Sequence, residues 1–150
     1  MKILTAQQTS ALEASTLQKR TLTERDFTSK KGAILAQKIS TDFPETTNFY
    51  IFCGNSKKGL IGLAAAEHLI KSGKKCYLFV LNITGNGDVL FTQALEELDK
   101  DKTSVEYINN ETNSPKGPSH TIVIDAIQVG KLDPSTENLP ALVIKNINAL

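Results

Sequence analysis

The chain lacks a long hydrophobic run, a cysteine framework and an excess of charge. No apolar stretch approaches the roughly 20 residues that a membrane-spanning helix needs, and Met1–Leu4 passes directly into the polar segment Thr5–Gln8. We therefore expect a cytoplasmic protein with no secretory segment and no membrane partner. Its 17 basic and 16 acidic residues are mixed along the sequence and give a net charge of +1, which argues against a nucleic-acid partner.

Cysteine and histidine are equally scarce, with two of each. Cys53 and Cys76 have no cysteine or histidine close by in the sequence, so they indicate neither a disulfide framework nor a zinc site. We expect both to be small buried residues, with a reactive thiolate at Cys53, beside a helix start, as the alternative. His68 in a helix and His120 at a strand start are interpreted as structural.

The hydrophobic pattern predicts strands separated by helices. Two leading helices are expected, from a capping box at Thr5 to about residue 19 and from a cap at Thr23 to a point before Pro44. Strands are predicted over residues 49–53, 76–81, 105–108 and 121–124, a loop over 109–119, and further helices over 58–71, after Asp88 and over 139–148. The second helix should carry Phe27, Ile34, Leu35 and Ile39 on one side.

Such alternation predicts an α/β fold: a Rossmann-like, doubly wound parallel sheet in three α/β/α layers, preceded by two helices. No linker or repeat divides residues 1–150, so we expect one domain. A domain of this length buries about 68–70% of its unfolded surface and needs no disulfide to be stable.

The first predicted strand-to-helix turn, residues 54–62, is the first candidate site. Backbone N–H groups at a helix start favour an anion, and Gly54, Gly59 and Gly62 would let a ligand approach the backbone. The spacing matches neither the dinucleotide fingerprint nor the phosphate-binding loop. A tight turn carrying solvated lysines is therefore an equally good interpretation.

Asp125 is the second candidate, because it follows a buried strand. A carboxylate there would reach the crevice in which open α/β sheets bind ligands. The alternative is an aspartate that only caps a turn. If the fourth strand pairs with the first, Asp125 and the loop after Gly54 flank the same crevice.

The sequence resembles the YjeF N-terminal domain family, the NAD(P)H-hydrate epimerases. The matching landmarks follow the family's order: Met1–Gln8, Phe52–Gly54, Gly62–Ala64, Val123–Ile127, Gly130, Leu132 and the helix over 139–148. The resemblance implies a Rossmann-like fold, inversion of C6 of hydrated NADH or NADPH, a homodimer, a potassium ion and a separate dehydratase that uses the product.

The same resemblance implies the roles of individual residues. Asp125 would be the catalytic residue and the potassium ligand. The substrate would lie against Asn55, Lys57, Lys58, Gly59, Gly62, Val129, Gly130 and Lys131.

The family's loop, G-x-G-N-N-G-G-D-G, is altered in this chain. Ser56 replaces a glycine, Lys57 and Lys58 replace both asparagines, and Leu60 and Ile61 replace a glycine and the aspartate. An ammonium group donates but cannot ligate potassium, so we hypothesise that Lys58 takes the cation's place and pairs with Asp125. The family's later D-x-P-S-G element has no counterpart, and we expect a domain that lacks the carboxyl-terminal strands.

These departures leave three functions open. The first is an epimerase-like protein that acts on or binds hydrated NADH or NADPH with impaired catalysis. The second is a module that binds a nucleotide without turnover, and the third is a scaffold domain, a use that the enhancer of mRNA decapping has made of this fold.

Overall fold

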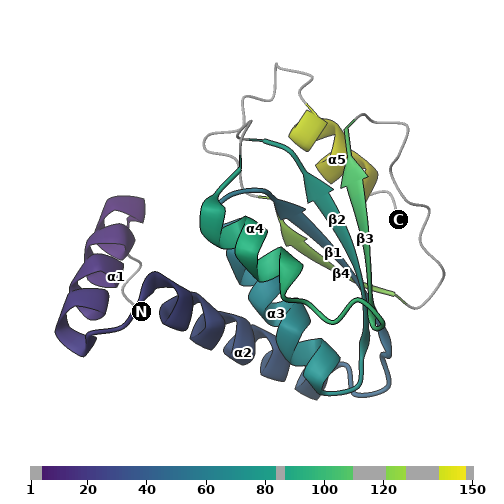
Figure 1. Cartoon of the computed structure of the whole chain (residues 1–150), viewed down its shortest axis with the longest axis horizontal. Coiled ribbons are helices and arrows are strands. Elements are labelled where there is room, and N and C mark those ends of the chain that lie inside the picture. The colour runs from purple at the N-terminus through teal and green to yellow at the C-terminus, as the bar shows by residue number, and fades with distance from the viewer. Residues whose placement is uncertain (1–4, 84–86, 110–120, 128–138, 148–150) are drawn as a thin grey trace.

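A computed structural model describes residues 5–83, 87–109, 121–127 and 139–147 (Figure 1). Two helices, α1 (Ala6–Arg20) and α2 (Glu24–Asp42), precede the first strand, β1 (Asn48–Gly54). Helix α3 (Gly59–Lys71), strand β2 (Lys75–Leu81), helix α4 (Val89–Glu96) and strand β3 (Thr103–Ile108) follow in that order. Strand β4 (Ile122–Ala126) and helix α5 (Leu139–Ile147) complete the described elements.

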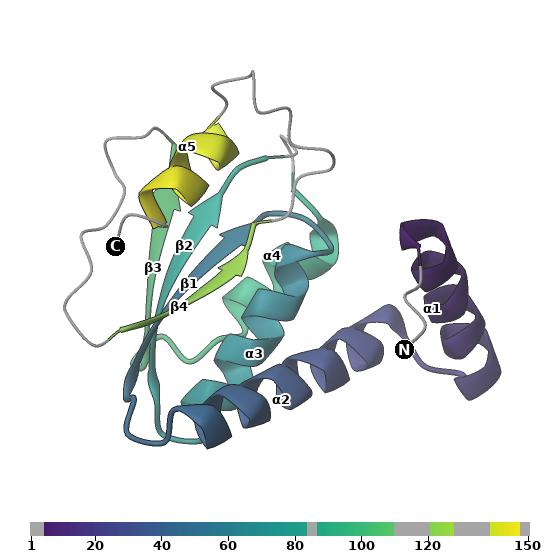
Figure 2. The ribbon, with the colours of Figure 1, turned by 180° about the vertical axis from the view of Figure 1, so that it is seen from behind.

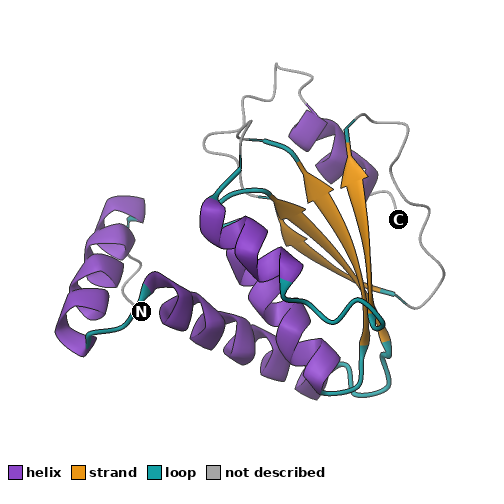
Figure 3. Cartoon of the chain, in the orientation of Figure 1, coloured by secondary structure: helices purple, strands orange, loops and turns teal. Residues whose placement is uncertain are grey.

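The four described strands form one parallel sheet in the order β3-β2-β1-β4 (Figure 3). Helices α3 and α4 cover one face of this sheet and α5 covers the other, while α2 packs outside α3 (Figures 1 and 2). Helix α1 stands apart from the sheet beyond the amino-terminal end of α2. The Rossmann-like α/β prediction is therefore confirmed, with both leading helices and with β4 beside β1.

Local sequence signals set most of the element boundaries. Thr5 and Thr23 each form a capping box at the start of their helices, and Asp88 Oδ1 accepts hydrogen bonds from Leu90 N and Phe91 N. Gly73, just after α3, has a φ of +83°, the left-handed conformation that glycine adopts readily. The predicted boundaries are thus confirmed to within two residues, while most of the predicted loop over 109–119 and His120 lie outside the described residues.

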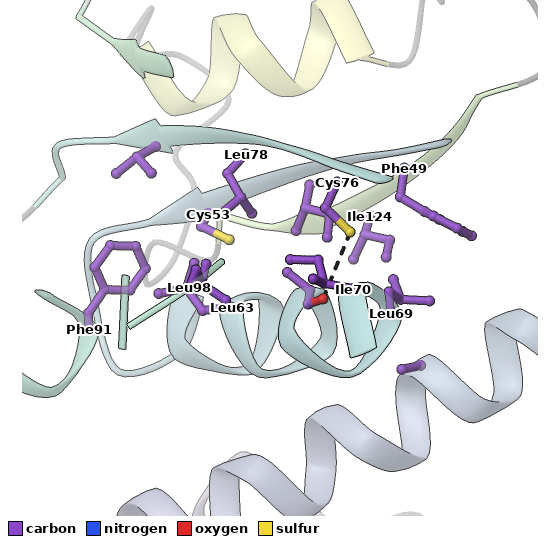
Figure 4. Packing of buried hydrophobic residues seen from close by; sticks show 14 residues of the cluster. Phe49, Cys53, Leu63, Leu69, Ile70, Cys76, Leu78, Phe91, Leu98 and Ile124 are labelled. Carbon is purple, nitrogen blue, oxygen red and sulfur yellow. Dashed lines mark hydrogen bonds between the residues drawn. The ribbon is translucent and has the colours of Figure 1, made fainter. Parts of the chain in front are cut away.

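Each face of the sheet has its own hydrophobic core. On the α5 face, Phe52 stacks on Phe79 at 4.8 Å between ring centroids, and Tyr50 meets Phe79 edge-on at 5.2 Å. On the α3 face, Cys53 and Cys76 lie among aliphatic side chains, with Cys76 Sγ 3.9 Å from the carbonyl oxygen of Ala66 (Figure 4). Both cysteines are fully buried, as the sequence predicted.

The buried face of α2 matches the prediction in part, because Leu35 and Ile39 pack against the α3-side core. Ile34 is 68% exposed, and the residues of α2 that are buried are small: Thr28, Gly32 and Ala36. A Cβ atom on Gly32 would lie 2.6 Å from the carbonyl carbon of Ala64 and 2.7 Å from Ala65 N. The axes of α2 and α3 approach so closely that only small residues fit between them, and this requirement outweighs the hydrophobic pattern.

The substitution Gly32→Ala tests this helix contact. In an exposed helix the change would stabilise by up to about 1 kcal/mol, but here the new methyl group must displace backbone atoms of α3. We expect a net loss of about 1–3 kcal/mol in the free energy of unfolding, measured by urea denaturation. Gln37→Ala, an exposed change on the same helix, should be nearly neutral; a Gly32→Ala protein as stable as this control would contradict the packing.

Candidate functional site

The space beside the Cα atom of each glycine in the 54–62 loop is filled by the protein's own atoms. A Cβ atom on Gly54 would lie 2.6 Å from the carbonyl oxygen of Ile127, and one on Gly59 would overlap the carbonyl group of Gly54. A Cβ atom on Gly62 would lie 2.7 Å from both Ala126 Cβ and Cys53 Sγ. These glycines therefore allow β1, α3 and the end of β4 to pack together, and the space beside each Cα is not open to a ligand.

Asn55 joins the loop to the end of the neighbouring strand β2. Its Nδ2 donates to Asn82 Oδ1 at 2.7 Å, and its Oδ1 accepts from Ile83 N at 2.8 Å. The backbone of Asn55 also donates to the carbonyl of Leu81 and accepts from Asp88 N, both at 3.0 Å. Asn55, predicted to bind substrate, is buried and holds the ends of β1 and β2 in register.

Lys57 and Lys58 face the leading helices. Lys57 Nζ donates to Glu24 Oε2 at 2.9 Å, and this hydrogen bond, followed by the charge of Glu24, raises the pKa of Lys57. Lys57, Lys58 and Ile61 line a cavity of about 420 Å³ whose other walls belong to α1 and α2. The loop is thereby tied to the start of α2.

Asp125 lies at the carboxyl end of β4, opposite Phe52 of β1. Ile124 belongs to the α3-side core, so the alternation of side chains places Asp125 on the α5 face. The residue is exposed, and its Oδ1 accepts a hydrogen bond from Ile127 N at 2.9 Å. The structure thus brings an accessible carboxylate to the edge at which the 54–62 loop begins.

The predicted ion pair between Lys58 and Asp125 is wrong. The ion pairs among the described residues do not include one between Lys58 and Asp125. The physical reason is their placement: Lys58 lines the cavity on the α2 side, whereas Asp125 projects on the α5 side of the sheet.

The side chains of the loop do not fit a potassium ion bound in the family's way. Lys58 carries an ammonium group where the resemblance implies an asparagine, and Asn55 Oδ1 already accepts a hydrogen bond from Ile83 N. No group of three or more His, Cys, Asp or Glu side chains that could hold a metal occurs among the described residues. Val129, Gly130 and Lys131 lie outside the described residues.

Two polar residues that the sequence analysis did not single out also lie at this edge. Asn82 follows β2 and Asn109 follows β3, and together with Asn55, Gly87 and Tyr107 they line a cavity of about 380 Å³. Asn82 and Asn109 each follow a buried residue at a strand's end, Leu81 and Ile108. A polar residue just after a buried strand, the signal that pointed to Asp125, could have identified both of them.

The Cys53 thiol is not activated, contrary to the reactive-thiolate alternative. Burial raises its pKa well above the usual range, and the nearby Asp125 carboxylate raises it further. Burial also raises the pKa of Cys76 to about 12. His68 lies among α2 and α3 side chains away from the carboxyl edge, as expected of a structural residue.

Removing the Asn55 side chain should loosen the end of β2. In Asn55→Ala the partly buried Ile83 N–H loses its acceptor, a change that costs about 1–3 kcal/mol. We expect faster amide exchange at Ile83, measured by NMR, together with reduced stability. Asn48→Ala, at the opposite end of β1, is the control, and unchanged exchange at Ile83 would contradict the proposed bridge.

The thiols should be inert in the folded protein. Both pKa values are raised, so raising the pH to about 8.5, where a free cysteine is half ionised, should still leave both thiols protonated. We expect almost no labelling by a disulfide reagent in native buffer and two equivalents in denaturant. Rapid labelling of one equivalent in native buffer would instead reveal an exposed thiolate.

The chain matches a protein family and is similar to solved structures. The family is described as "YjeF-related protein N-terminus", and its match covers residues 24–150. No curated protein matches the chain. None of the described helices is long and apolar enough to cross a membrane.

A solved structure of the yeast protein YNL200c has a similar fold, with a TM-score of 0.74 at 18% sequence identity. The similarity covers 98% of this chain but only 63% of the yeast chain. At this identity the likeness concerns the fold alone. The family match, which extends from the start of α2 through β1, the 54–62 loop and Asp125, shows that this chain belongs to the YjeF N-terminal domain family.

Proposed function

We propose that this protein is an NAD(P)H-hydrate epimerase-like member of its family, which binds hydrated NADH or NADPH at the carboxyl edge of β1 and β4 with reduced turnover. The observation that carries this proposal is the exposed Asp125 carboxylate, placed on β4 directly beside β1. In open α/β sheets this is the crevice in which ligands bind.

Asp125 is proposed to carry the acid–base step. Epimerisation inverts the hydroxyl-bearing carbon of the hydrated nicotinamide ring, so a bond to that carbon must break and re-form on the opposite face. A carboxyl group beside the carbon can protonate the hydroxyl so that it leaves as water, with the lone pair of the ring nitrogen stabilising the cation, and can take the proton back when water adds to the opposite face. The Ile127 N–H holds one oxygen of Asp125 at 2.9 Å, and this hydrogen bond fixes the orientation of the carboxylate. The carboxylate is therefore positioned before the substrate arrives.

The loop explains why turnover should be low. Lys57 is held by Glu24, Lys58 faces the leading helices, and Leu60 is buried at the start of α3. None of these side chains supplies an oxygen ligand for potassium, so we propose a reaction without stimulation by that ion. The same features favour the second candidate function, a module that binds the hydrated dinucleotide without converting it.

The first experiment measures the conversion of the inactive epimer of hydrated NADH by a coupled, epimer-specific dehydratase. We expect a rate above the spontaneous one, equal in potassium and in tetramethylammonium buffers. Asp125→Asn should reduce the rate to background while leaving the melting temperature within a few degrees, because the side chain is exposed. A rate that persists in Asp125→Asn would overturn the catalytic assignment.

The outcome also separates the two candidates when combined with a thermal shift. A rate equal to background, with stabilisation of about 2.7 kcal/mol at 100 times the dissociation constant of the hydrated dinucleotide, would indicate the binding module. An epimerisation rate equal to the spontaneous one, without any thermal shift, would exclude both candidate functions and favour the scaffold.

A further inference from the structure

The cavity at the ends of β2 and β3 combines aromatic walls with amide groups. Its volume of about 380 Å³ falls in the range of small-molecule sites. The residues that line it are Asn55, Val80, Asn82, Gly87, Phe91, Thr92, Leu95, Tyr107 and Asn109. It opens on the α4 side of the carboxyl edge, since Val80 and Phe91 belong to the core on that face.

Among the residues that line the cavity, Tyr107 is the one that best indicates what the cavity could bind. It is 56% exposed, whereas the buried Phe91 closes the inner side of the cavity. Tyr107 lies on β3, an edge strand of the described sheet, and leaves apolar ring surface in contact with solvent. Such a ring offers a flat surface on which a planar heterocycle can stack.

The polar groups suit the edge of a nucleobase. Asn82 and Asn109 are exposed, and an amide side chain presents a donor and an acceptor side by side. Paired donor and acceptor atoms are what the edge of an adenine ring requires. Asn82 is oriented by Asn55 Nδ2, which donates to Asn82 Oδ1 at 2.7 Å.

The position of the cavity matches the length of a dinucleotide. Neighbouring strands lie about 4.8 Å apart, and the sheet order places β1 between β4, which carries Asp125, and β2. The cavity between β2 and β3 is therefore roughly 10–14 Å from Asp125 along the edge of the sheet. Because Asp125 projects on the α5 side and the cavity opens on the α4 side, the ligand would cross over the carboxyl ends of the strands between them. A ligand with two ring systems joined by a flexible diphosphate can span this separation.

We propose that this cavity binds a nucleobase, stacked on Tyr107 and hydrogen-bonded by Asn82 and Asn109. For the identity of the remaining ligand the proposal rests on the proposed function: the base would be the end of the dinucleotide distant from the hydrated ring. Tyr107 and Asn82 would then bind the nucleobase, a part of the ligand that does not react.

The test uses adenosine, which carries the base but neither phosphate nor nicotinamide. Titration monitored by NMR of the ¹⁵N-labelled protein should shift the amide signals of residues 82, 107 and 109. We expect Tyr107→Ala to weaken adenosine binding about tenfold or more, while Tyr107→Phe stays within about twofold of the original protein. Val105→Ala is the matched control, because Val105 lies on the same strand and face but does not line this cavity; it lines a neighbouring cavity, which Tyr107 also borders.

Each outcome decides the inference. Loss of adenosine binding in Tyr107→Ala with retention in Val105→Ala would support it. Absence of these shifts at millimolar adenosine, or equal affinity in the Tyr107→Ala and Val105→Ala proteins, would overturn it. Epimerisation that continues without adenosine binding would reject this site and leave the proposed function intact, whereas adenosine binding without epimerisation would do the reverse.

Discussion

The structure depends on the close approach of α3 to its neighbours on two sides. Gly62 lets α3 contact Ala126 of β4 and Cys53 of β1, and Gly32 of α2 lies against Ala64 and Ala65 of the same helix. Small residues at both contacts give α3 a dense, largely apolar environment, in which Leu63, Ala65, Ala66 and Leu69 are at most 1% exposed. Helix α3 thus packs against the sheet on one side and against α2 on the other.

This packing changes the meaning of the family's glycine-rich loop. Glycines in such a loop suggest an open backbone that a ligand can approach, yet Gly54, Gly59 and Gly62 each face protein atoms. They would be required for the fold even if nothing were bound. At the intervening positions this chain carries Ser56, Lys57 and Lys58, where the resemblance implies a glycine and two asparagines. The chain therefore retains the glycines that the packing requires, while the side chains between them differ.

The carboxyl edge of the sheet divides into two regions separated by Asn55. On one side, Asp125 lies on β4. On the other side, Asn82 follows β2 and Tyr107 belongs to β3. Asn55 contacts the second region through its side chain and continues into the loop that ends at α3. Because its side-chain amide both donates to Asn82 and accepts from Ile83, Asn55 ties the end of β1 to the segment that follows β2.

The sequence alone determined the order of elements, because capping residues, glycine stops and apolar runs are local signals that act within a few residues. The parallel sheet, the buried cysteines and the position of Asp125 at a strand's end followed from the same signals. Only the tertiary structure decided that small residues of α2 form its contact with α3, that Lys58 and Asp125 project on opposite sides of the sheet, and that Asn82 and Tyr107 share a cavity. Those facts depend on the distance between packed elements and on the alternation of side chains across paired strands, which residues far apart in the sequence set jointly.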